Sequence, residues 1–190
     1  MERWKRTNDT EATDLGIATL RWHTAISPRT GSAGRYFSLE SADWVNVIPI
    51  TPKGDVVLVR QYRHGTDSII LEIPGGIVEH GEDPQLAAAR EMKEETGFVA
   101  ERWIDLGVVE ANPAFQTNKC HSFLALGCTQ VSDQRLDGSE DIAIIRLPLQ
   151  EVGRKIQNGE IQHAMVICAF FWYLQHGQPA GKLFAHTTIG

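Results

Sequence analysis

A helix with clear start and stop signals is predicted in the middle of this 190-residue chain. Asp83 can cap its first turn, Pro84 suits the first helical position, and Gly97 suits the left-handed position just past its end. The segments on both sides carry strand patterns instead. This order constrains the fold, because such a helix has to cover the sheet that the strands form.

Eight further segments are predicted as strands: residues 17–24, 34–39, 44–51, 55–62, 69–73, 104–110, 119–126 and 142–147. A second long helix is predicted at residues 160–175, apolar on nearly every side and therefore buried or at a subunit interface. Together these elements predict an α/β layered domain, in which helices cover a sheet. The short strands at the start predict a small β-rich arm at residues 1–43, followed by the main domain at residues 44–190.

The composition excludes several classes of partner. A formal charge of −6 argues against nucleic acid, whose phosphates require clustered Lys and Arg. Three cysteines without a CxxC pair argue against a disulfide framework or a zinc knuckle and favour a reducing compartment. No apolar stretch follows the basic N-terminus, and the longest apolar run, residues 164–174, falls short of the roughly 20 residues that span a bilayer. We therefore expect a soluble, cytoplasmic protein without a membrane partner.

Three carboxylates share one face of the central helix. Glu91, Glu94 and Glu95 stand at positions i, i+3 and i+4, where they repel one another. They also lie in the last turn, where the helix dipole prefers cations. A bound hard cation such as Mg²⁺ or Mn²⁺ would resolve both conflicts, because it prefers oxygen ligands. The alternative is a solvated acidic face in which Arg90 pairs with Glu94.

These carboxylates belong to a longer pattern of residues with fixed spacings. It starts at Gly76, has Glu82 after five intervening residues, and has Arg90 after seven more. Its nine fixed positions are Gly76, Glu82, Arg90, Glu91, Met92, Glu94, Glu95, Gly97 and Phe98. With all spacings intact, the segment resembles the signature of the Nudix hydrolase family. The resemblance implies a loop, helix and loop packed on a mixed sheet within an α/β/α sandwich.

The same resemblance implies roles for individual residues. Glu91 and Glu95 would coordinate a divalent metal, Glu94 would add a further contact as a catalytic carboxylate, and the carbonyl of Gly75 would complete the site. The expected cofactor is Mg²⁺, with Mn²⁺ as an alternative, because metal ions neutralise the diphosphate charge that an acidic protein repels. The resemblance implies structural roles for Gly76, Glu82, Arg90 and Gly97. Of these, Glu82 and Arg90 would brace the loop against the helix.

Features outside the signature resemble the ADP-ribose and nucleotide-sugar pyrophosphatase branch of the family. They are Pro113, which stands 15 residues after Phe98, the segments VRQYR at 59–63 and LEIPG at 71–75, and the strand-rich arm. The resemblance implies that the arm helps to build a homodimer and that Arg63 approaches the substrate diphosphate. Phe37 and Trp44 are candidates for stacking on the nucleobase.

Each of these features has a simpler alternative. Pro113 can mark an ordinary turn, Arg63 can be an exposed cation at a strand end, and the two aromatic residues can pack in a core or an interface.

The general base is not evident where that branch commonly carries a glutamate, because residues 115–119 contain no carboxylate. The best candidate is Glu140, in a flexible loop at residues 136–141, since mobile loops often deliver a catalytic group. Asp141 is the second candidate. The alternatives are an ordinary acidic turn and a reaction that needs no protein base.

The sequence therefore predicts a homodimeric, Mg²⁺-dependent pyrophosphatase. Its expected substrate is a nucleoside diphosphate sugar such as ADP-ribose or ADP-glucose, which water would cleave to a nucleoside monophosphate and a sugar phosphate. The alternatives are a nucleoside-triphosphate or dinucleoside-polyphosphate hydrolase and a binding protein that senses nucleotide sugars without cutting them.

Overall fold

The computed structural model describes residues 1–138 and 140–176, without the side chains of residues 8–10. The chain divides into two compact units. The first comprises Met1–Asp43 and Glu110–Lys119, and the second comprises Trp44–Val109 and the chain from Cys120 onward. The division predicted from the sequence, residues 1–43 and 44–190, stays a prediction, and its last residues, 177–190, lie outside the described part of the chain.

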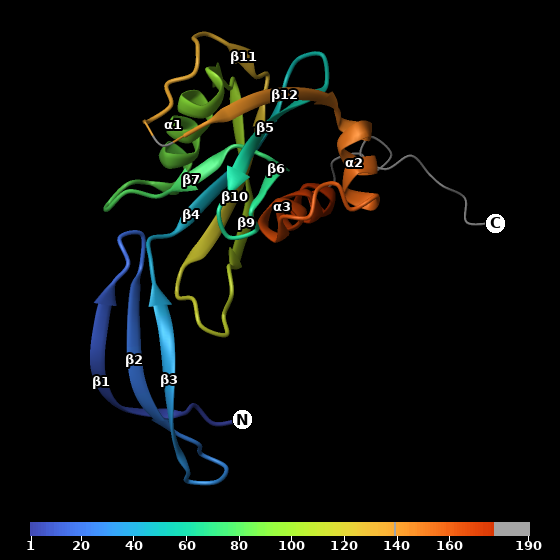
Figure 1. Cartoon of the computed structure of the whole chain (residues 1–190). Helices are drawn as coiled ribbons and strands as arrows, with labels where there is room; N and C mark the ends of the chain where they lie inside the picture. The colour runs from blue at the N-terminus through green and yellow to red at the C-terminus, as the bar shows by residue number, and fades with distance from the viewer. Residues whose placement is uncertain (139, 177–190) are drawn as a thin grey trace, which may run out of the picture. The chain divides into compact units, whose positions relative to one another are not determined.

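The first unit contains a three-stranded antiparallel sheet (Figure 1). Its strands are β1 (Lys5–Asp14), β2 (Thr19–Ile26) and β3 (Ala33–Glu40). Residues 110–119 are joined to this sheet by two backbone hydrogen bonds of Leu39. Its N–H donates to the Phe115 carbonyl at 2.7 Å, and its carbonyl accepts the Thr117 N–H at 3.1 Å. Strand β1 was not predicted, because its sequence KRTNDTEATD is almost entirely polar and lacks an apolar pattern.

The second unit is built on a mixed sheet with the strand order β12-β5-β4-β10-β9, to which β6 and β7 are added. Strands β4 (Trp44–Ile50) and β10 (Lys119–Leu126) run parallel, whereas β5 (Asp55–Arg63) is antiparallel to β6 (Ser68–Glu72) and β12 (Ile142–Pro148). The remaining strands of this unit are β7 (Gly75–Ile77), β8 (Phe98–Val99), β9 (Arg102–Glu110) and β11 (Thr129–Gln130).

Helices cover both faces of this sheet (Figure 1). Helix α1 (Pro84–Thr96) packs Ala88 and Met92 on a cluster that includes Val57. Helices α2 (Leu149–Gln157) and α3 (Ala164–Gln175) pack against the opposite cluster, which contains the neighbouring strand residues Val56 and Leu58. Successive side chains of a strand point to opposite faces of the sheet, so they pack into two separate hydrophobic cores. The predicted α/β layered fold with a mixed sheet is confirmed.

A fork in the sheet positions the carboxylate helix. The register of β4 and β5 contains one pair, Ile50 with Val56. Beyond that pair the two strands have different partners: β5 pairs with β6, and β4 pairs with β7, in which Gly75 lies opposite Asn46. The Val47 N–H donates to the carbonyl of Pro74 at 2.9 Å and closes the fork. Gly75 and Gly76, at the start of β7, therefore lie within the sheet, beside the part of β4 that α1 covers.

Two helical regions differ from the sequence prediction. The last helix begins at Ala164 rather than at residue 160, and it buries one side while Ile167 and Phe171 stay exposed. Helix α2 was not predicted, because Pro148 offers it no side-chain cap. The spacing of its apolar residues Leu149, Val152 and Ile156 is the signal that could have revealed it. Among the described residues, no helix is long and apolar enough to span a membrane.

Both predicted ends of α1 are confirmed. The Asp83 carboxylate accepts from the backbone N–H groups of Gln85 and Leu86, at 2.9 and 3.2 Å. Gly97 adopts the left-handed conformation, with φ of 73°, and donates to the Lys93 carbonyl. A Cβ atom on Gly97 would overlap the carbonyl oxygen of Ser132, so glycine is required here for two separate reasons.

We expect Gly97→Ala to lower the free energy of unfolding by about 3 kcal/mol, because left-handed strain of about 1–2 kcal/mol adds to the overlap with Ser132. Gly81→Ala is the matched control, since Gly81 has a φ of 79° but open space around its Cα. The control should lose about 1–2 kcal/mol, from the strain alone. Urea unfolding of both variants measures the difference, and equal losses would contradict the role given to the Ser132 contact.

Candidate functional site

The predicted metal-ligating carboxylates lie on the face of α1 that meets the fork. Glu95 is 4% exposed, and its carboxylate accepts the Gly75 N–H at 3.0 Å. Glu91 lies against Gly76, where a side chain in place of the glycine hydrogen would overlap the Glu91 carboxylate. Glu94 is more open, with 44% of its side chain exposed. The structure therefore brings Glu91, Glu95 and the two glycines together in one buried corner.

The surroundings of this corner disfavour ionised carboxylates. Burial, together with the nearby charges of Glu91 and Glu140, raises the pKa of Glu95 to about 8. The Gly75 N–H and the more distant Arg63 act in the opposite direction. Burial also raises the pKa of Glu91, although Arg90 partly offsets this effect. Two carboxylates held in this way fit a site for a cation.

Arg90 joins the helix to the loop that precedes it. Its guanidinium donates two hydrogen bonds to the Glu82 carboxylate, at 3.0 and 2.9 Å, and one to the Ile77 carbonyl at 3.0 Å. The remaining nitrogen, Nη1, donates to Glu91 at 2.7 Å and to Glu94 at 3.4 Å. These carboxylates raise the pKa of Arg90, so the guanidinium is charged at every accessible pH.

The three carboxylates do not form a ready-made metal cluster. Within residues 1–138 and 140–176, no group of three His, Cys, Asp or Glu side chains is placed to hold a metal ion. The reason is visible in the ion pairs, because Arg90 Nη1 draws Glu91 and Glu94 to itself while Glu95 faces Gly75. The donors still fit a hard cation chemically, since all three are carboxylates and burial raises the pKa values of Glu91 and Glu95.

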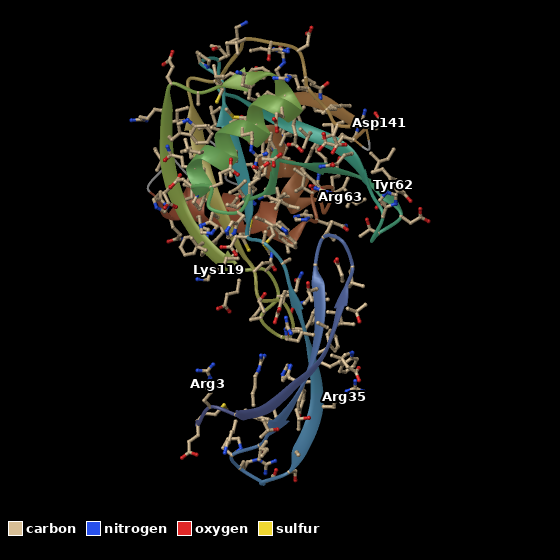
Figure 2. All side chains as sticks on the ribbon, turned by 90° about the vertical axis from the view of Figure 1, so that its left-hand side faces the viewer. Arg3, Arg35, Tyr62, Arg63, Lys119 and Asp141 are labelled. Atoms are coloured by element: carbon tan, nitrogen blue, oxygen red, sulfur yellow. The ribbon has the colours of Figure 1, made fainter. Side chains whose placement is uncertain are left out.

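Arg63, labelled in Figure 2, is the last residue of β5, and although 43% of its side chain is exposed, its guanidinium is paired. Its Nε and Nη2 donate to the two carboxylate oxygens of Glu72, at 2.9 and 2.7 Å. Glu72 is 3% exposed, so the guanidinium is anchored to a buried partner. Its charge acts on Glu95, whose pKa it lowers. Sequence reasoning missed Glu72, although a charged residue within the apolar run ILEIP was a signal for it.

Glu140 and Asp141 lie exposed just before β12 (Figure 2 labels Asp141). The Glu140 carboxylate accepts the backbone N–H of Asp137 at 3.0 Å. Glu140 is close enough to Glu91 and Glu95 to raise the pKa of both. The predicted loop at residues 136–141 also contains Ser139, which lies outside the described residues. The role of Glu140 as the general base stays a prediction.

The two aromatic candidates belong to different units. Phe37 lies on β3 and packs against Trp22 and Phe115, with ring centroids 5.5 and 5.7 Å away. Trp44 starts β4 in the other unit and is half-buried, opposite Ile77. Their stacking on a nucleobase stays a prediction.

Known proteins resemble this chain in sequence and in fold. The family model of the NUDIX domain matches residues 41–170. An ADP-ribose pyrophosphatase of Bacillus subtilis (strain 168) is 30% identical over 146 residues, which cover 76% of this chain and 78% of that protein. A methanol dehydrogenase activator of Bacillus methanolicus is 36% identical over 132 residues, covering 69% and 71% of the two chains.

A solved structure also has this fold. The crystal structure of an ADP compounds hydrolase matches with a TM-score of 0.81 at 23% sequence identity, covering 93% of this chain and 95% of that chain. The Nudix signature at residues 76–98 lies wholly within the segment that the family model matches. The resemblance noted from that signature is thereby confirmed.

We expect Arg90→Lys to lower the free energy of unfolding by about 2–3 kcal/mol, because an ammonium cannot reproduce the forked bonds to Glu82 and leaves partly buried carboxylates without partners. Arg154→Lys is the matched control, since Arg154 forms an exposed ion pair with Glu151 on α2. That variant should lose less than about 0.5 kcal/mol. Denaturant unfolding compares the two, and a loss at Arg90 no larger than that at Arg154 would contradict the bracing role.

Proposed function

This chain belongs to the Nudix hydrolase family, and we propose that it is a divalent-metal-dependent pyrophosphatase acting on nucleoside diphosphate sugars. The observation that carries this proposal is the buried corner of Glu91 and Glu95 against Gly75 and Gly76. A protein with a formal charge of −6 would repel a diphosphate there unless a cation lay between them. A cation satisfies the carboxylates and attracts the substrate at once.

The proposed metal ligands are Glu91, Glu94, Glu95 and the carbonyl of Gly75. The expected ion is Mg²⁺, with Mn²⁺ as a substitute, because all of these donors are hard oxygens. When bound, the metal would neutralise diphosphate charge and make water a better nucleophile. Arg90, which Glu82 holds through two bonds, remains beside the carboxylates to balance their charge.

The remaining steps use side chains of this chain. We assign Glu140 as the general base that accepts a proton from the attacking water, and Asp141 is the second candidate. The water oxygen bonds to one phosphorus, and the bond from that phosphorus to the bridging oxygen breaks. Arg63 would contact the diphosphate through Nη1, since its Nε and Nη2 are bonded to Glu72. The products are a nucleoside monophosphate and a sugar phosphate.

The proposed substrate class is supported by the relatives. The Bacillus subtilis relative is an ADP-ribose pyrophosphatase, and a mouse relative that is 36% identical over 117 residues is an ADP-sugar pyrophosphatase. We therefore propose ADP-ribose, ADP-glucose or a similar nucleotide sugar. Trp44 and Phe37 are each proposed as a candidate for stacking on the base.

The proposal includes a homodimer in the cytoplasm. Tyr36 and Phe37 on the edge strand β3 are 42% and 40% exposed, and a second subunit would bury such aromatic surface. Cys128 and Cys168 are free thiols, which suits a reducing compartment.

With Mg²⁺ present, we expect ADP-ribose or ADP-glucose to be turned over with a kcat/KM at least about tenfold above that for dGTP, because the proposed site recognises both halves of a nucleotide sugar. Side-by-side kinetics with ADP-ribose, ADP-glucose, GDP-mannose and dGTP measure this preference. A clear preference for dGTP would favour a nucleoside-triphosphate hydrolase, and binding without turnover would favour a sensor.

Glu95→Gln should lower kcat/KM by about 100- to 1,000-fold, because the amide cannot supply the charge that holds the cation. Its free energy of unfolding without metal should stay the same or rise, since a buried ionisable group is removed. Glu151→Gln on α2 is the control and should retain full activity. Kinetics over a range of Mg²⁺ concentrations, together with urea unfolding, separate these effects, and an unchanged rate for Glu95→Gln would refute the metal site.

A further inference from the structure

The segment after β11 runs along the C-terminal end of α1. The N–H groups of Val131 and Ser132 donate to the Gly97 carbonyl at 2.9 and 3.3 Å, and the N–H of Arg135 donates to the Glu94 carbonyl at 2.8 Å. The last carbonyls of a helix have no partner within the helix. Here a distant segment of the chain supplies those partners, so its path is tied to the helix that carries the site carboxylates.

Gln134 adds a side-chain bridge at this place. Its amide nitrogen donates to the Glu95 carbonyl at 2.6 Å and to the Ile142 carbonyl at 3.0 Å. One amide group thus joins the backbone of a proposed metal ligand to the first residue of β12. The side chain is half-buried, which protects both bonds from competition with water.

Glu140 lies within the chain segment that this bridge closes. It stands two residues before Ile142, and its carboxylate accepts the N–H of Asp137 within the same turn. The other end of this segment is held on α1, because the Arg135 N–H donates to the Glu94 carbonyl and the Gln134 amide donates to the Glu95 carbonyl. The position of the Glu140 carboxylate relative to the site therefore depends on how the two ends of residues 134–142 are held.

We propose that Gln134 is a positioning residue that sets the distance between Glu140 and the site carboxylates through its two hydrogen bonds. This inference rests on the proposed function, in which Glu140 takes the proton from the attacking water. A displacement of about 1 Å can cost on the order of 100-fold in rate when the group is catalytic. Both hydrogen bonds of the Gln134 amide go to backbone carbonyls of the protein, so its removal should affect the chemical step and leave binding intact.

The test is a double-mutant cycle between Gln134→Met and Glu140→Gln. Methionine has a similar length and volume but no hydrogen-bond donor. Gln134→Glu is the second variant, because it keeps the polarity and also lacks the donors. Gln130→Met is the matched control: the Gln130 amide, which is exposed on β11, donates to the Ser132 carbonyl two residues away at 3.3 Å. Each variant is assayed for kcat, KM, Mg²⁺ activation and unfolding by urea, with the best substrate of the wild-type protein.

Gln134→Met should lower kcat by about 10- to 100-fold, with KM and the Mg²⁺ activation constant changed less than about twofold. In the Glu140→Gln background, the same substitution should lower kcat no further, since its effect passes through the missing carboxylate. Gln130→Met should behave as wild type. If Gln134→Met is poorly folded, Gln134→Glu is expected to give the same result.

Two results would overturn the inference while leaving turnover of nucleotide sugars intact. An equal loss of kcat in both backgrounds would show that Gln134 acts on the helix or the fold rather than through Glu140. An unchanged kcat for Glu140→Gln would remove the group through which it is proposed to act. The proposed function itself fails on a different measurement, namely the substrate preference of the wild-type protein.

Discussion

The contact between the Gly75 N–H and the Glu95 carboxylate is the interaction on which the site depends. It exists because β4 and β5 separate after one residue pair, so that β7 pairs with β4 and its two glycines lie under the last turns of α1. A side chain at Gly75 would overlap the backbone of β4, and one at Gly76 would overlap Glu91. The missing side chains therefore let a buried carboxylate approach the backbone closely.

The arrangement of charge around this contact follows a consistent rule. Two arginines act on the carboxylates of α1, and each is held by a glutamate, Arg90 by Glu82 and Arg63 by Glu72. The arginines are thereby fixed in place but partly neutralised, so little positive charge is left to stabilise an ionised Glu95. A divalent cation would supply that charge, and it prefers oxygen ligands. The burial that makes ionised carboxylates unfavourable without metal is therefore the same feature that would favour binding of the proposed cation.

The sequence predicted most of the fold, because apolar alternation and turn residues act locally. All eight predicted strands exist, with boundaries within a few residues. Strand β1 was missed because a polar strand in a small sheet carries no alternation, and α2 because its start lacks a capping side chain. Among the site residues, the signature located Glu91 and Glu95, whereas Glu72 and Gln134 emerged only from contacts between segments distant in the chain.

The sequence by itself determined the ends of α1 and the crowding of three carboxylates on one face, since helix caps and i, i+3, i+4 spacing depend on neighbouring residues alone. The tertiary structure decided how those carboxylates are partnered. Arg90 reaches Glu91, Arg63 turns back to Glu72, and Gln134 bridges Glu95 to β12. The last two of these contacts join residues of different elements, because folding, rather than sequence spacing, brings their side chains within hydrogen-bond distance.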